Sequence, residues 1–109
     1  MAKGESLLGA IDLLVLKVLS SRPGLHGYAI MSAIRVASNE VLRIEEGSLY
    51  PALHRMEEAG WIRASWITKE NGRRARAYRI LAAGKKRLNA EESRWRTVTS
   101  AVNRALGEV

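Results

Sequence analysis

The first part of the chain is predicted to form a helix that is apolar on more than one side. Between Leu7 and Leu19, apolar residues recur at helical spacing, and Leu13 and Leu16 extend the apolar surface around the other side. A chain of 109 residues is long enough for one small core but has few elements with which to cover such a helix. We therefore expect a single compact unit in which a second copy of the chain supplies part of the cover.

A second apolar stripe lies near the other end of the chain. From about Ala83 to Leu106 the spacing is again helical, with apolar positions at Leu88, Trp95, Val98, Val102 and Ala105. Glu91 interrupts this seam, so a regular coiled coil is not expected. The rest of the helix is polar, and the first helix is the obvious surface for its stripe. Two apolar helices at opposite ends of so short a chain predict a two-fold homodimer.

Two shorter helices are expected between these ends. Pro23-Gly24 marks a turn before a helix from His26 to Ser38, which Asn39 ends. A short connection then leads into the stretch from Gly47 to Gly60. Two helices joined by a few residues, the second with an exposed polar face, are typical of a helix-turn-helix.

The second of these helices has recognisable ends. Ser48 is expected as its N-cap, Pro51 in its first turn and Gly60 at its C′ position. Its apolar face consists of Leu49, Leu53 and Met56. A helix N-terminus with hydroxyl, imidazole and guanidinium groups can approach phosphates and base edges, although an ordinary amphipathic surface helix would show the same pattern.

Beyond Gly60 the period changes to that of strands. Residues 62–66 and 78–80 alternate apolar and polar side chains, and Asn71-Gly72 between them can supply the positive φ angles of a tight hairpin turn. The loop region carries Arg73, Arg74 and Arg76. Residues 61–90 contain nine basic residues and one acid, and their net positive charge exceeds the net charge of +7 of the whole chain. This concentration predicts a local surface for nucleic acid.

Several other classes of function are disfavoured. Cysteine is absent, and His26 and His54 are the only histidines, so neither a disulfide nor a clustered metal site is expected. We see no nucleophile–base pair, paired carboxylates or phosphate-cradling glycine loop, so we expect neither an enzyme nor a cofactor. The N-terminus shows no signal peptide or membrane span, and a cytoplasmic protein is expected.

Five blocks of sequence resemble a known family. They are Leu25-His26-Gly27-Tyr28-Ala29-Ile30, the stretch from Gly47 to Gly60, Asn71-Gly72-Arg73-Arg74, Tyr78-Arg79-Ile80 and Ala83-Gly84. In this order and spacing they resemble the phenolic-acid-decarboxylase-regulator (PadR) family of bacterial winged-helix transcription factors, over nearly the whole chain.

The resemblance implies a mainly α fold with a β-hairpin. It implies a winged helix-turn-helix DNA-binding domain over residues 1–81 and a C-terminal dimerisation helix over residues 82–109, which together form one compact unit. It also implies a homodimer that represses transcription by binding operator DNA, with the Gly47–Gly60 helix in the major groove and the hairpin as the wing. A two-fold dimer predicts an inverted-repeat operator. Family members typically cap the last helix with Thr, where this chain has Leu81, which cannot accept the N–H bond.

The geometry of such a domain predicts the residues that contact DNA. They are Ser48, Tyr50, Pro51, His54 and Arg55 on the helix and Arg73, Arg74 and Arg76 on the wing. His54 and Arg55 also fit ordinary solvated surface positions. The alternative function is a winged-helix module for protein interaction or RNA binding without operator specificity, because fold alone does not identify the partner.

Trp95 lies on the apolar stripe of the last helix and has two interpretations. A large aromatic side chain on a dimerisation seam is usually core. Alternatively, Trp95 and its symmetry mate line a cavity between subunits, since some short members of the family bind flat aromatic compounds there. Glu91, Glu92 and Thr99 lie within one turn and would give such an effector site polar character.

Overall fold

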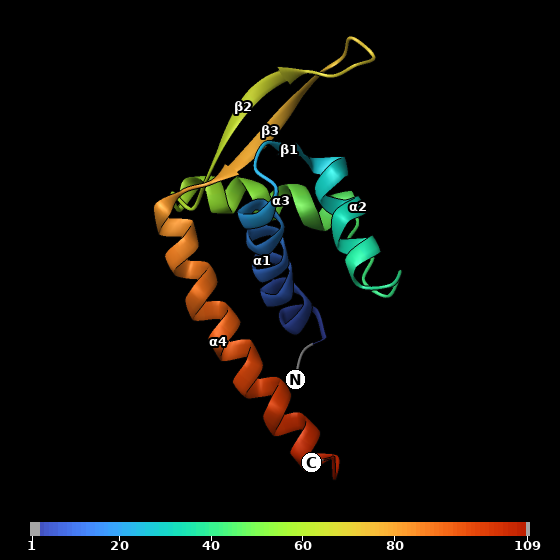
Figure 1. The fold of residues 1–109 in the computed structure, drawn as a ribbon, viewed down its shortest axis with the longest axis vertical. Helices are drawn as coiled ribbons and strands as arrows, with labels where there is room; N and C mark the ends of the chain where they lie inside the picture. The colour runs from blue at the N-terminus through green and yellow to red at the C-terminus, as the bar shows by residue number, and fades with distance from the viewer. Residues whose placement is uncertain (1–2, 109) are drawn as a thin grey trace.

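The computed structural model describes residues 3–108, and their side chains from residue 10 onward. This part of the chain forms helices α1 (Lys3–Ser21), α2 (Gly27–Ala37), α3 (Glu46–Glu58) and α4 (Ala82–Ala105), and strands β1 (Leu25–His26), β2 (Ile62–Thr68) and β3 (Arg74–Ile80). Figure 1 shows the β2–β3 hairpin extending from one end of a helical body, with α4 starting at the base of the hairpin and running past α1 toward the opposite end. The predicted fold class, mainly α with a hairpin, is confirmed.

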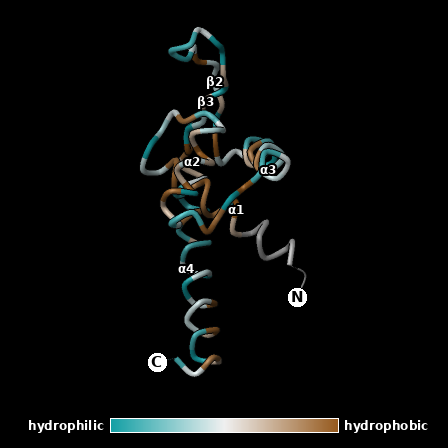
Figure 2. Tube along the Cα trace, turned by 90° about the vertical axis from the view of Figure 1, so that its right-hand side faces the viewer, coloured by the Kyte–Doolittle hydropathy of each residue, from teal (hydrophilic) through white to brown (hydrophobic). Residues whose placement is uncertain are grey.

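The core surrounds α1, as its apolar sequence predicts. Ile11, Val15, Leu16 and Leu19 are almost completely buried, and they share one cluster with Ile30 of α2 and with the apolar face of α3, which is Leu49, Leu53 and Met56. Figure 2 shows apolar chain gathered where α1, α2 and α3 meet. Leu7 and Leu8, which the sequence placed on the same stripe, have side chains outside the described residues.

The start of α3 differs from the prediction. The helix begins at Glu46 with Glu45 as its N-cap, and no side chain caps it. Ser48 is therefore inside the helix and not its N-cap, because the extended backbone that precedes a helix occurs at Glu45. Pro51 is correspondingly in the second turn and not the first. Its missing N–H leaves the carbonyl of Gly47 without the usual donor, but both residues are exposed, so water can supply the bond.

The end of α3 is as predicted. Gly60 has a φ of +79°, and its N–H donates to the carbonyl of Glu57 at 3.0 Å. The N–H of Trp61 donates to the carbonyl of Met56 at 3.0 Å. Together these bonds form a Schellman motif, which ends the helix and turns the chain into β2.

The sheet contains one strand that periodicity did not predict. Its order is β1-β3-β2, all antiparallel, with Leu25 opposite Tyr78 and Thr68 opposite Arg74. At the hairpin tip only Gly72 has a positive φ, +83°. The N–H of Gly72 donates to the carbonyl of Lys69 at 2.9 Å, and the N–H of Lys69 donates to the carbonyl of Arg73 at 2.8 Å. The turn is therefore a three-residue loop with a glycine bulge, in which Gly72 alone, and not Asn71 with it, supplies the positive φ angle.

Helix α4 starts without a side-chain cap, as Leu81 predicted. Instead the N–H of Leu81 donates to the carbonyl of Trp61 at 2.8 Å, which ties the start of α4 to the end of α3. Beyond Leu88 the apolar side of the helix is increasingly exposed, and the exposed fraction is 41% for Val98, 50% for Val102 and 71% for Leu106. Half of α4 therefore presents an apolar stripe that α1 of the same chain does not cover.

Candidate nucleic-acid interface

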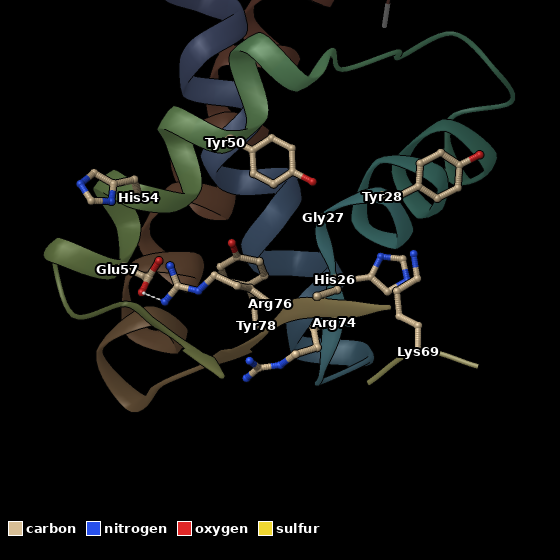
Figure 3. A pocket seen from close by; sticks show the side chains of 11 residues that line it. His26, Gly27, Tyr28, Tyr50, His54, Glu57, Lys69, Arg74, Arg76 and Tyr78 are labelled. Carbon is tan, nitrogen blue, oxygen red and sulfur yellow. Dashed lines mark hydrogen bonds and ion pairs between the residues drawn. The ribbon is translucent and has the colours of Figure 1, made fainter. Parts of the chain in front are cut away.

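A cavity of about 500 Å³ lies between helix α3 and the hairpin. Figure 3 shows its lining side chains, which come from β1 and the start of α2, from α3, from the hairpin turn and from β3. The polar members with a basic or aromatic side chain are His26, Tyr28, Tyr50, His54, Lys69, Arg74, Arg76 and Tyr78. Donor groups from three separate elements thus border one concave surface, as is required to follow a phosphate backbone.

Helix α3 exposes most of the residues predicted to contact DNA. Tyr50, Pro51 and His54 are exposed, and Ser48 is half-buried. The hydroxyl end of Tyr50 lies so close to Gly27 at the start of α2 that any Cβ there would displace the ring. His54 Nε2 lies 3.1 Å from the carboxylate of Glu58, one turn along the helix. Gly27 thus leaves the space that the Tyr50 ring occupies, while His54 pairs with an exposed residue of its own helix.

Arg55 has a partner that its place in the sequence did not indicate. Its guanidinium donates to Oδ1 of Asp12 on α1 and forms an ion pair with it. Burial raises the pKa of the Asp12 carboxyl above its usual range, and the nearby Arg55 opposes this shift only in part. The interaction joins α3 to α1, and it competes with any contact between the same guanidinium and a base.

The wing arginines fall into two kinds. Arg76 Nη2 donates to Oε2 of Glu57 on α3 at 3.1 Å, which ties the wing to that helix. Arg73 and Arg74 are exposed, and no carboxylate among the described residues lies within ion-pair distance of either. Their charges therefore remain available to an anionic partner.

Several residues of this surface were not predicted from the sequence. His26 and Tyr28 line the cavity because the short strand β1 pairs with β3 and brings the start of α2 beside the hairpin. Lys69 also lines it, and the exposed Trp66 stands beside Arg74. The only signal for the first two was their presence in the block from Leu25 to Ile30. A two-residue strand has no periodicity from which to predict its pairing.

The residues predicted for an effector site are brought together only in part. Trp95 and Glu92 line a hollow of about 220 Å³ between α1 and α4, with Leu13, Leu14, Lys17 and Arg96. Glu92 pairs with Arg96 at 2.9 Å and with Lys17 at 3.5 Å, and the hydrogen bond from Arg96, with the charge of Lys17, lowers its pKa. Glu91 instead pairs with Arg87 and Arg94, and neither Glu91 nor Thr99 lines the hollow.

Residues 3–108 contain neither a cluster of metal-ligating side chains nor a membrane-spanning helix. No group of three or more His, Cys, Asp or Glu side chains in this part of the chain could hold a metal ion. In the same residues, no helix combines the length and apolar character needed to cross a membrane.

Comparison with known proteins gives consistent matches. Residues 15–90 match the model of the transcriptional regulator PadR-like family. A transcriptional regulator from Clostridium thermocellum superposes with a TM-score of 0.81 at 28% identity, covering 92% of this chain and 96% of that one. A PadR family transcription regulator from Clostridium difficile superposes with a TM-score of 0.71 at 28% identity, covering 88% and 97%. An uncharacterized protein of Lysinibacillus sphaericus is 25% identical over 103 residues, 94% of each chain.

Proposed function

Because the chain belongs to the PadR-like family of transcriptional regulators, we propose that it is a repressor that binds an inverted-repeat operator as a homodimer in the cytoplasm. One observation carries the proposal furthest. Tyr50 and His54 of α3 and Arg74 of the hairpin line the same cavity, and Arg73 precedes Arg74 at the exposed hairpin tip. Among the described residues, neither arginine has a carboxylate within ion-pair distance. A helix beside a basic hairpin is the arrangement with which winged helices contact a groove and the flanking backbone.

The two surfaces take different roles in this proposal. Ser48, Tyr50, Pro51 and His54 on α3 contact base edges and phosphates in the major groove, and Arg73, Arg74 and Arg76 meet the backbone or the adjacent minor groove. Arg55 is the exception. Its ion pair with Asp12 supports a role in holding α3 on α1 and not a role in reading bases.

The homodimer is supported by the uncovered apolar stripe of α4. Val98, Val102 and Leu106 are spaced at four-residue steps and are exposed in the single chain. A second copy related by a two-fold axis would bury this stripe against its own α1 or α4 and would place two α3 helices for two half-sites.

The proposed dimer would also bind a small aromatic effector. The hollow beside Trp95 has apolar walls from Leu13 and Leu14 and lies at the edge of the uncovered stripe. A ligand bound there between subunits would change operator affinity by the same factor by which DNA changes its own affinity.

The test is selection of genomic DNA fragments by the purified protein, followed by titration of the selected site and of a scrambled duplex at several salt concentrations. The double variant Arg73→Ala/Arg74→Ala should weaken binding to both duplexes and lower the salt slope by about 1 for each lost phosphate contact. The matched control is Arg63→Ala/Arg79→Ala, because these two exposed arginines pair across the opposite face of the same hairpin. The control should retain the slope of the wild type.

Two results would contradict the proposal. Equal affinity of the wild type for unrelated duplexes, or preference for RNA, would favour the interaction or RNA-binding module instead. Equal effects of the two double variants would show that the wing contributes only overall charge.

A further inference from the structure

Trp66 is a large aromatic side chain in an unusual place. It lies on β2 with 60% of its surface exposed, outside the core cluster. Residues directly opposite each other in the register lie on the same face of the hairpin, and Trp66 is opposite Arg76 while Thr68 is opposite Arg74. Trp66, Arg74 and Arg76 therefore share the face that turns toward α3. Core packing does not account for this tryptophan.

Both arginines approach the indole ring. The Cζ atom of Arg74 lies 4.9 Å from the ring centroid and that of Arg76 lies 5.9 Å from it. These distances are within the range in which the negative face of an indole attracts a guanidinium. The ring therefore restrains Arg74 at the edge of an exposed hairpin and adds a second contact to Arg76.

The two guanidiniums differ in what else they bind. Arg76 also donates to Glu57 of α3 at 3.1 Å, so part of its charge is used within the protein. Arg74 has no carboxylate within ion-pair distance among the described residues, and a neutral ring is its partner. Stacking on a neutral ring orders the arginine without compensating its charge. An arginine ordered in advance loses less side-chain freedom when it binds an anion.

We propose that Trp66 is a positioning residue, which holds the Arg74 guanidinium in the orientation in which it meets a DNA phosphate. Arg76, shared between Trp66 and Glu57, fixes this arrangement to α3. The inference rests on the proposed DNA-binding function and adds to it a residue that acts through another.

A double-mutant cycle tests the coupling. Operator affinity is measured by fluorescence anisotropy of a labelled duplex, at one salt concentration, for Trp66→Val, Arg74→Ala and the combination. Trp66→Val alone should weaken binding about two- to fivefold, which corresponds to an exposed cation–π contact. In the Arg74→Ala background the same change should have a clearly smaller effect, because only the more distant Arg76 then remains beside the ring.

Two controls separate positioning from a general effect on the fold. In the Arg73→Ala background, Trp66→Val should retain its full effect, because the neighbouring arginine does not stack on the ring. Trp66→Tyr keeps an aromatic face and should restore most of the affinity. Urea unfolding of each variant reports whether the hairpin change alters stability, and if Trp66→Val is destabilised, the cycle is repeated with Trp66→Thr, which also lacks a ring and suits a strand.

The possible failures are distinguishable. If Trp66→Val weakens binding equally with and without Arg74, Trp66 touches DNA itself or only supports the strand, and the inference is overturned while the proposed function stands. If the wild type binds no duplex at all, the proposed function fails, and the positioning role fails with it.

Discussion

His26 connects three parts of the fold through one side chain. Its Nδ1 accepts the N–H of Ala29 at 3.3 Å and so caps α2, its backbone pairs with Ala77 of β3, and its ring borders the cavity beside Lys69. Burial lowers the pKa of the imidazole, and the positive charge of Lys69 lowers it further. Only the neutral ring can accept the capping bond, so protonation and the cap exclude each other.

This residue gives the fold a defined pH dependence. The folded pKa of His26 lies below its unfolded value of about 6.5, so its contribution to stability is complete above that pH and is lost as pH falls through the folded pKa. His26→Asn should cap α2 at every pH and remove this dependence, while His26→Ala should lose about 1 kcal/mol at pH 8. Urea unfolding between pH 5 and pH 8 measures both. An identical acid loss in wild type and His26→Asn would assign the dependence to another group.

Helix ends show what residue types predict and what they do not. Gly60 and Leu81 were interpreted correctly, because glycine permits a positive φ and leucine cannot accept a hydrogen bond. Ser48 was misassigned, because a good capping residue is common in the vicinity of a helix start without being its cap. His26 was not expected as a cap, since histidine is not among the preferred capping residues.

At the scale of elements, the contact of α3 with α1 depends on a polar pair at the edge of an apolar core. Asp12 is largely buried while the guanidinium of Arg55 is half exposed. Because the folded pKa of Asp12 is raised, its contribution to stability is present below about 3.8 and is lost as pH rises through the folded pKa. At neutral pH the ionised Asp12 carboxylate therefore lowers the free energy of unfolding, and its ion pair with Arg55 reduces that loss.

The two halves of this pair should respond differently to removal. Arg55→Ala leaves a buried carboxylate without its donor and should lose about 1–3 kcal/mol at pH 7. Asp12→Asn removes the buried charge and keeps an oxygen that can accept from Arg55, so it should be at least as stable as the wild type. The double variant should recover most of the loss of Arg55→Ala. Urea unfolding at pH 7 measures the free energy of unfolding of each variant. An equal loss of stability in Arg55→Ala and Asp12→Asn would contradict this account.

Elements were easier to predict than the pairs between them. The apolar faces of α1 and α3 and the strand period of the hairpin are local patterns, so they are readable from spacing. Arg55 and Asp12 are 43 residues apart, and which acid an arginine meets depends on how the helices pack. The same applies to Trp66, whose two arginines are brought to it by the register of β2 and β3.

At the scale of the whole molecule, the exposed apolar stripe on α4 predicts that two copies of the chain form a dimer. Val98→Asp with Val102→Asp would place two buried charges in the proposed interface, and the protein should then sediment as a 12.1 kDa monomer. Ser93→Asp is the matched control, because Ser93 is exposed on the opposite side of the same helix and should leave the dimer intact. A wild type that is monomeric at micromolar concentration would contradict the prediction.

Trp61 gives α3 and α4 a common anchor. Its N–H donates to the carbonyl of Met56 and closes the end of α3, and its carbonyl accepts the N–H of Leu81, the N-cap of α4, so both helix ends are joined to one residue. Helix α4 has 24 residues and is about 36 Å long. In a symmetric dimer it would act as a lever: a change of about 5° where two copies cross moves its far end by about 3 Å, close to the ~3.4 Å rise between base pairs. Operator spacing would then be determined by side chains on α4, and base preference by side chains on α3, so substitutions can change one without the other.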